Sequence, residues 1–144
     1  VLVEVQQNSD TTYRLYDYDR PRQLQLEQGL QAMRERTGAG RVVPGSLKSM
    51  LAVAPWFRVE RFLVEGESVQ FHKNTQPSSA WVVMGLDGCG VVAAGGMETS
   101  LATGDALVVP AAIPEFTVRP QWRLEYLAIA VPAPGAPHPP TKAS

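Results

Sequence analysis

The sequence has few residues that bind metals or form covalent cross-links. It contains two histidines, His72 and His138, and one cysteine, Cys89. An intrachain disulfide therefore cannot form, and a single cysteine is typical of proteins from the reducing cytosol. So few imidazoles also limit metal chemistry, because transition-metal sites are usually built from several His, Cys and carboxylate side chains.

The sequence also lacks an excess of positive charge and a long apolar run. Its 13 Lys and Arg residues against 14 Asp and Glu give a net charge of -1, which excludes a nucleic-acid binder that works through a basic surface. No run approaches the ~18 apolar residues of a membrane span, and residues 1–7 lack the features of a signal peptide. We therefore expect a cytoplasmic protein that binds neither nucleic acid nor membranes.

The composition favours turns and short strands over long helices. Hydrophobic residues make up 44% of the 144 residues, which is enough for the core of one globular domain. Gly and Pro number 12 each, about 17% of the chain against a usual value of about 12%. A surplus of turn-forming residues of this kind is typical of all-β folds.

Alternation of apolar and polar residues predicts a series of strands. The Asp87-Gly88 dipeptide predicts a hairpin turn, and strands spaced by about ten residues indicate a β-sandwich or β-barrel. The predicted strands cover residues 1–6, 13–18, 56–64, 68–73, 81–86, 91–94, 97–101, 106–109, 115–118 and 123–131.

Residues 26–36 are expected to form one short amphipathic helix. Leu26, Leu30 and Met33 recur at helical spacing, although Gly29 costs about 1 kcal/mol relative to alanine. Residues 41–55 show no clear pattern. The stretch 132–144, with five prolines, is expected to be an extended or disordered tail.

Two passages resemble one enzyme family. The run Gln6-Gln7-Asn8-Ser9-Asp10-Thr11-Thr12-Tyr13-Arg14 within residues 1–20 resembles the signature segment of type I mannose-6-phosphate isomerases of the cupin superfamily. Residues 56–131 resemble the smaller C-terminal cupin-like domain of these enzymes. The resemblance implies a mainly β, cupin-like (jelly-roll) barrel or sandwich with one short helical segment. It implies four parts: 1–20, terminal strands of a preceding cupin half that is missing here; 21–55, a helical linker; 56–131, the C-terminal cupin-like β-domain; and 132–144, a Pro-rich tail.

The resemblance also implies a chemistry. Members of the family interconvert mannose 6-phosphate and fructose 6-phosphate through a cis-enediol, with zinc held by Gln, His, Glu and His. Those four ligands are expected upstream of Val1, so we expect no metal or other cofactor in this chain. The active-site arginine of the family corresponds to Arg14, whose planar guanidinium is suited to binding sugar oxygens or an enediolate. On spacing alone, an arginine among tyrosines is more often a solvated or ion-paired residue.

The remaining candidates favour structural roles. His72 is the single imidazole where a cupin metal site needs more, so we expect it to make ordinary hydrogen bonds, and Cys89 is expected to be a small packed side chain. Two charged groups are expected at the surface and six aromatics in the core. They are Glu60, Glu65 and Glu67 on a solvated hairpin rim; Asp17, Asp19, Arg20 and Arg22 in a surface cluster; and Trp56, Phe57, Phe62, Trp81, Phe116 and Trp122 in the core.

Two functions from different classes remain open. The first is the C-terminal part of a mannose-6-phosphate isomerase, in which Arg14 acts on a sugar phosphate only in the full-length context. The isolated chain is then expected to bind no zinc, to be inactive, and to self-associate through residues 1–18 or leave them disordered. The second is a stand-alone, non-catalytic cupin-like module that binds a ligand or partner or is structural. A metal-dependent oxygenase or epimerase is disfavoured by the histidine count.

Overall fold

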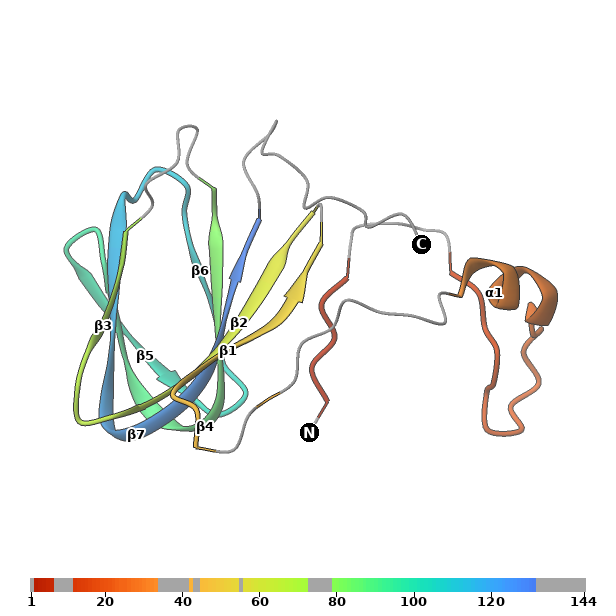
Figure 1. Cartoon of the computed structure of the whole chain (residues 1–144), viewed down its shortest axis with the longest axis horizontal. Coiled ribbons are helices and arrows are strands. Elements are labelled where there is room, and N and C mark those ends of the chain that lie inside the picture. The colour runs from red at the N-terminus through yellow and green to blue at the C-terminus, as the bar shows by residue number, and fades with distance from the viewer. Residues whose placement is uncertain are drawn as a thin grey trace. The chain divides into compact units, whose positions relative to one another are not determined.

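The computed structural model describes residues 2–6, 12–33, 42, 45–54, 56–72 and 79–131. The chain divides into two compact units, Val1–Gly38 and Ala39–Ser144, which are considered separately below (Figure 1). The predicted Pro-rich tail, 132–144, and His138 lie outside the described residues.

The first unit contains one short helix, α1, Leu26–Ala32. Gly29, which weakens a helix by itself, is buried against Leu15, and a Cβ atom at this position would overlap the Leu15 side chain, so the close approach requires glycine. The strands predicted over 1–6 and 13–18 are wrong for the described residues, because 2–6 and 12–18 contain no strand. Instead, Tyr18 and Asp19 both have positive φ angles, of 51° and 58°, and Arg20 N–H donates to Asp17 O at 3.0 Å. This geometry is a tight turn of the I′ type.

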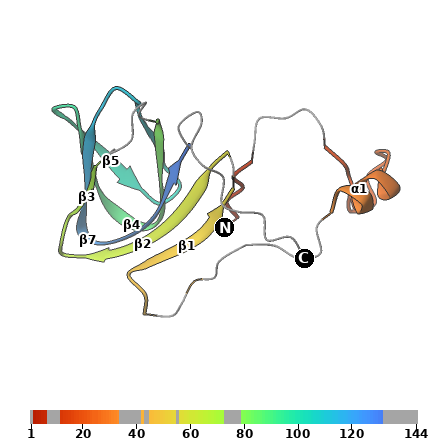
Figure 2. The ribbon, with the colours of Figure 1, turned by 45° about the horizontal axis from the view of Figure 1, so that its top comes forward.

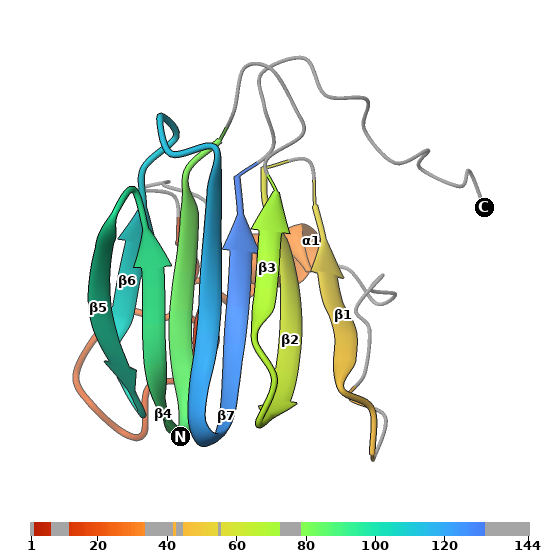
Figure 3. The same ribbon diagram turned by 90° about the vertical axis from the view of Figure 1, so that its left-hand side faces the viewer.

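The second unit is an antiparallel β-domain. Seven strands form its sheet, in which β1, β2, β7, β4 and β5 are successive neighbours, while β3 pairs with β7 and β6 with β4 (Figure 3). The strands are β1 Lys48–Val53, β2 Arg58–Glu65, β3 Val69–His72, β4 Trp81–Ala94, β5 Met97–Ala102, β6 Ala106–Val109 and β7 Glu115–Ala130. The mainly β fold with one short helix agrees with the fold class predicted from the sequence.

Two long strands fold the sheet back on itself. The first part of β7 pairs with β3 and with the end of β4, whereas its last part pairs with β2 and with the start of β4. The two halves therefore face each other across a shared interior, as the curled ribbon in Figure 2 shows. The sequence predicts two separate strands at 115–118 and 123–131, but a single continuous strand, β7, covers both.

The hairpin predicted at Asp87-Gly88 is also wrong. β4 continues through this dipeptide, and its pairing with β7 shifts register between Gly85 and Asp87 and again between Gly88 and Gly90. Gly88 has φ +80° and lies so close to β7 that a Cβ atom would overlap Arg123 O. A glycine with positive φ serves a β-bulge as well as a turn, and here the bulges bend a continuous strand.

The linker predicted over 21–55 is wrong in its last part. Residues 48–53 form β1, which pairs antiparallel with β2, so the β-domain begins before the predicted Trp56. Residues 48–53 show no clear strand pattern because β1 buries Ser49 and exposes Lys48 and Met50, the reverse of a simple amphipathic strand.

Aromatic rings fill the interior of the β-domain. Phe71 stacks on Phe116 with centroids 4.6 Å apart, and Phe62 stacks on Tyr126 at 5.2 Å. Phe62, Trp81 and Phe116 are buried as predicted. The core prediction is wrong for two tryptophans, since Trp56 is 55% exposed and Trp122 is 82% exposed, while Phe57 is half-buried.

Among the described residues, no helix has the length and hydropathy that a membrane span requires.

Candidate functional site

Arg14 lies in the first unit and is fixed at its backbone. Its N–H donates to Gln25 Oε1 at 2.9 Å, and its carbonyl accepts from Gln25 N–H at 2.9 Å. The side chain is one-third exposed, and Nε lies 3.7 Å from Asp17 Oδ1. At 3.7 Å the contact is an ion pair and is too long for a hydrogen bond. The carboxylate therefore attracts the guanidinium without using its N–H donors, which can bind another group.

Asp17 is the anchor of this segment. Its carboxylate is buried and accepts two hydrogen bonds from Arg22, from Nε to Oδ2 at 2.6 Å and from Nη2 to Oδ1. The predicted surface cluster is therefore wrong for Asp17 and right for the exposed Asp19, Arg20 and Arg22. The Asp17–Arg22 pair and the Asp17–Arg20 turn therefore brace the chain next to Arg14.

His72 meets Glu115 at the end of the β3–β7 pair. The two residues are register partners, and His72 Nδ1 lies 3.3 Å from Glu115 Oε2, with both side chains more than half exposed. Within the described ranges, no group of three or more His, Cys, Asp or Glu side chains could hold a metal ion. The described residues therefore do not fit the zinc of the resembled family, and His72 makes an ordinary polar contact.

A buried ionic cluster in the β-domain was not foreseen from the sequence. Glu60 was expected on a solvated rim, but it is 5% exposed, whereas Glu65 and Glu67 are exposed as predicted. Its Oε1 lies 2.8 Å from Lys48 Nζ and its Oε2 3.6 Å from Arg58 Nε. Both cations also cover aromatic rings, Lys48 over Phe62 at 5.1 Å and Arg58 over Trp81 at 5.0 Å.

The hydroxyl group of Tyr126 lies in the same interior. Tyr126 is 0% exposed, and its hydroxyl has no hydrogen-bond partner among the described residues. Burial, and to a lesser extent the charge of Glu60, raise the pKa of Tyr126 well above its ordinary value of 10.0. The phenol is therefore neutral and is a potential donor. One signal in the sequence pointed here: Glu60 has the same alternation phase as Phe62 and Val64.

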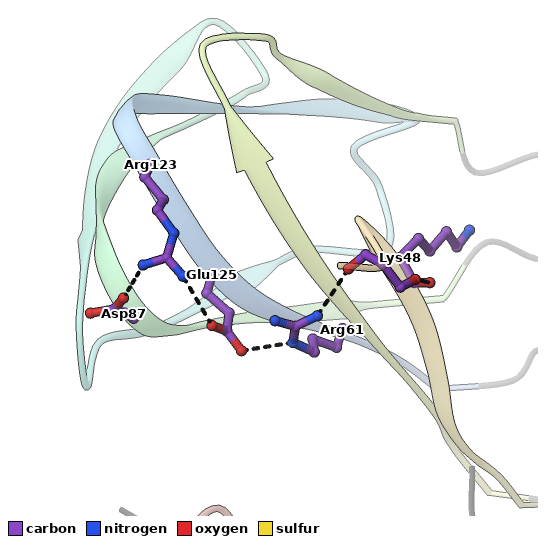
Figure 4. A network of polar contacts seen from close by, with 6 residues as sticks. Lys48, Arg61, Asp87, Arg123 and Glu125 are labelled. Atoms are coloured by element: carbon purple, nitrogen blue, oxygen red, sulfur yellow. Dashed lines mark hydrogen bonds and ion pairs between the residues drawn. The ribbon is translucent and has the colours of Figure 1, made fainter. Parts of the chain in front are cut away.

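A second ionic network joins β2, β7 and β4 on the other side of the sheet (Figure 4). Arg61 Nε lies 2.7 Å from Glu125 Oε1, and Arg61 Nη1 donates to Ser46 O at 3.1 Å. Arg123 pairs with Asp87 and, at 3.9 Å, with Glu125. The Arg61–Glu125 pair joins β2 to β7 and the Arg123–Asp87 pair joins β7 to β4, so the sequence alone did not show them. These pairs connect neighbouring strands and therefore support the sheet.

Cys89 differs from its prediction. It was expected to be packed, but its side chain is exposed and Sγ donates to Gln121 Oε1 at 3.0 Å. Cys89 lies beside the bulges of β4, where the irregular backbone turns it outward.

Comparison with known proteins adds sequence relatives. No protein-family model matches the chain. The mannose-6-phosphate isomerase of Streptococcus mutans is 31% identical over 121 residues, covering 76% of this chain and 37% of that enzyme. The Bacillus subtilis protein YvyI, which carries the same enzyme name provisionally, is 28% identical over 132 residues, covering 83% of this chain and 40% of its own length. The chain thus spans about 40% of the length of such relatives.

Solved structures with a similar fold are cupins. A cupin protein from Bacteroides fragilis has a TM-score of 0.55 at 16% identity and matches 78% of this chain and 97% of its own. A cupin superfamily protein from Desulfitobacterium hafniense has a TM-score of 0.53 at 19% identity and matches 85% of this chain and 100% of its own. The chain therefore has a cupin fold and is distantly similar, over about 40% of their length, to mannose-6-phosphate isomerases.

Proposed function

We propose that this chain is the C-terminal part of a mannose-6-phosphate isomerase and contributes one wall of the sugar-phosphate site. The observation that carries the proposal is the similarity to the Streptococcus mutans enzyme over 76% of this chain but only 37% of that enzyme. The remaining length of such an enzyme has room for a separate zinc-bearing cupin half. The described residues offer no metal site of their own, so that half would supply the zinc.

Arg14 is the residue of this chain that would act on the substrate. An aldose–ketose isomerisation moves a proton between C1 and C2 and builds negative charge on oxygen in the enediol-like transition state. A fixed guanidinium stabilises such charge because it remains protonated and can donate two parallel hydrogen bonds. The anchored backbone and the partly exposed side chain of Arg14 fit this electrostatic role.

The first test compares the chain alone with the chain joined to a zinc-bearing cupin half. Isomerase activity is followed by coupling fructose 6-phosphate formation to NADPH absorbance, and zinc is measured by elemental analysis. We expect no activity and no zinc in the chain alone, and both in the joined protein. Full activity of the chain alone after dialysis against a chelator would refute the proposal.

The second test isolates Arg14 within the joined protein. Arg14→Lys keeps the charge but loses the planar fork, so kcat should fall by about 100-fold, the effect of removing one transition-state donor. Arg20→Lys is the matched control, because Arg20 lies in the same segment and is exposed. An Arg14→Lys variant as active as the Arg20→Lys control would remove Arg14 from the catalytic role.

A second function is supported by a different observation. The Bacteroides fragilis and Desulfitobacterium hafniense cupins are matched over 97% and 100% of their own chains, so a cupin fold of this size exists as a whole protein. A stand-alone, non-catalytic cupin module is therefore the alternative. The gene distinguishes the two: an in-frame cupin-coding sequence directly upstream favours the isomerase, and an independent start codon favours the module.

A further inference from the structure

Glu60 and Tyr126 are neighbours on the interior face of the β-domain. In the β2–β7 register, Glu60 lies opposite Ala128 and Phe62 lies opposite Tyr126. Glu60 and Tyr126 are therefore diagonal partners on one face of adjacent strands, a separation that long side chains bridge. The residue directly opposite Glu60 is an alanine, so no large side chain of β7 stands between the carboxylate and the phenol.

The two groups are close but are not hydrogen bonded to each other. The Tyr126 hydroxyl has no partner among the described residues, although Tyr126 is completely buried. The charge of Glu60 nevertheless contributes to raising the pKa of Tyr126, which requires the two groups to be near each other. A buried hydroxyl without a hydrogen-bond partner has lost its hydration without compensation, so an unfilled arrangement of this kind is unfavourable.

Glu60 has acceptor capacity left for another donor. Lys48 Nζ lies at hydrogen-bond distance from Oε1, 2.8 Å away. Arg58 Nε is 3.6 Å from Oε2, which is beyond an ordinary hydrogen bond. A carboxylate offers about four lone-pair positions, so both oxygens can accept further bonds.

We propose that a hydroxyl oxygen binds inside the barrel between Tyr126 and Glu60, accepting from the Tyr126 hydroxyl and donating to the Glu60 carboxylate. Two sources share this chemistry: an ordered water and one hydroxyl of a small polyol. Lys48, the partner of Glu60, and Phe62, which stacks on Tyr126, line a groove of about 480 Å³ next to the cluster, although Glu60 and Tyr126 do not line it themselves. The proposal does not depend on isomerase activity, since Arg14 belongs to the other unit.

The sign of one stability change tests the proposal. If a hydroxyl oxygen bridges the two groups, Tyr126→Phe deletes a hydrogen bond and lowers the midpoint of urea unfolding of the full chain. If the Tyr126 hydroxyl is unpartnered, the same variant removes a desolvation cost and leaves the midpoint unchanged or raises it. Ser49→Ala is the matched control, because Ser49 Oγ is also buried and has no hydrogen-bond partner within the described part of the chain. A midpoint for Tyr126→Phe equal to or above that of Ser49→Ala overturns the proposal.

A ligand titration then separates the two sources. The thermal midpoint of the wild type and of Tyr126→Phe is measured with increasing myo-inositol. A rise in the wild type that exceeds the rise in Tyr126→Phe identifies a polyol as the occupant. Equal responses, together with the lowered urea midpoint of Tyr126→Phe, identify the occupant as water. Equal responses without a lowered urea midpoint overturn the proposal.

Discussion

Replacing Gly88 by alanine tests the idea that the sheet bends only because β4 and β7 approach each other closely at a bulge. Gly88 has φ +80°, and a Cβ atom there would overlap Arg123 O and lie 3.0 Å from Arg123 C and 3.4 Å from Leu124 Cα. These are backbone atoms of the neighbouring strand, so no side-chain rotation can relieve the overlap. The bulge itself would have to rearrange.

The size of the effect follows from a comparison with Gly96. Gly96 has nearly the same φ, +79°, but a Cβ atom there would meet nothing within 4 Å. Gly96→Ala therefore measures the cost of a left-handed backbone alone, which is about 1–2 kcal/mol. Gly88→Ala adds the steric overlap, so we expect a total loss of at least about 3 kcal/mol, which is large for a single substitution.

The assay is urea unfolding of the full chain, followed by circular dichroism and tryptophan fluorescence. The free energy of unfolding of each variant is compared with that of the wild type. Losses of equal size in Gly88→Ala and Gly96→Ala would show that the close approach to β7 costs nothing, and would refute this account of the bent strand.

Three further outcomes concern buried or charged groups. Because burial raises the pKa of Tyr126 above 10.0, the stability contributed by its neutral form is complete below pH 10.0 and is lost as pH rises toward the raised pKa, so alkaline titration should leave Tyr126 neutral until the chain unfolds. Ionisation of Tyr126 before unfolding would contradict this. Arg61→Ala should cost about 3 kcal/mol in urea unfolding, because it removes the 2.7 Å partner of Glu125, which is only 21% exposed, and leaves it only the longer contact with Arg123 at 3.9 Å; a loss below that of His72→Ala would show that this ion pair does not support the sheet. His72→Ala should itself change the free energy of unfolding by less than about 1 kcal/mol, since its pair with Glu115 is exposed, and a larger loss would show that this pair matters.

The strand predictions succeeded best where one face of a strand is more deeply buried than the other. Residues 81–86 alternate between buried and half-buried positions and lie in β4. The predictions failed at 13–18, where alternation of tyrosines with charged residues reflects a turn held by Asp17 rather than a sheet. A local pattern does not reveal whether a partner strand is present, and pairing is what makes a strand.

The polar sites show the same division. The glutamates at 60, 65 and 67 look alike in the sequence, yet Glu60 alone among them is buried, because the alternation of β2 turns it inward beside Lys48 and Arg58. Likewise, Trp122 and Trp81 are the same residue type, yet Trp81 is buried and the Trp122 side chain is exposed. Only the backbone of Trp122 is engaged, because its carbonyl accepts a hydrogen bond from Gly66 N–H just after β2. The candidate role of Arg14 came from the sequence motif, whereas its two hydrogen bonds with Gln25 are visible only in the folded structure.

The sequence by itself determined the all-β character of the larger unit, the shortness of the single helix and the shortage of metal ligands, because these depend on composition and local periodicity. The tertiary structure decided that β4 and β7 run unbroken through their glycines, that Glu60 and Tyr126 share one interior, and that Asp17 is buried. These features depend on which strands or side chains meet across long sequence separations. The free energy of such contacts belongs to the pair and cannot be read from either residue alone.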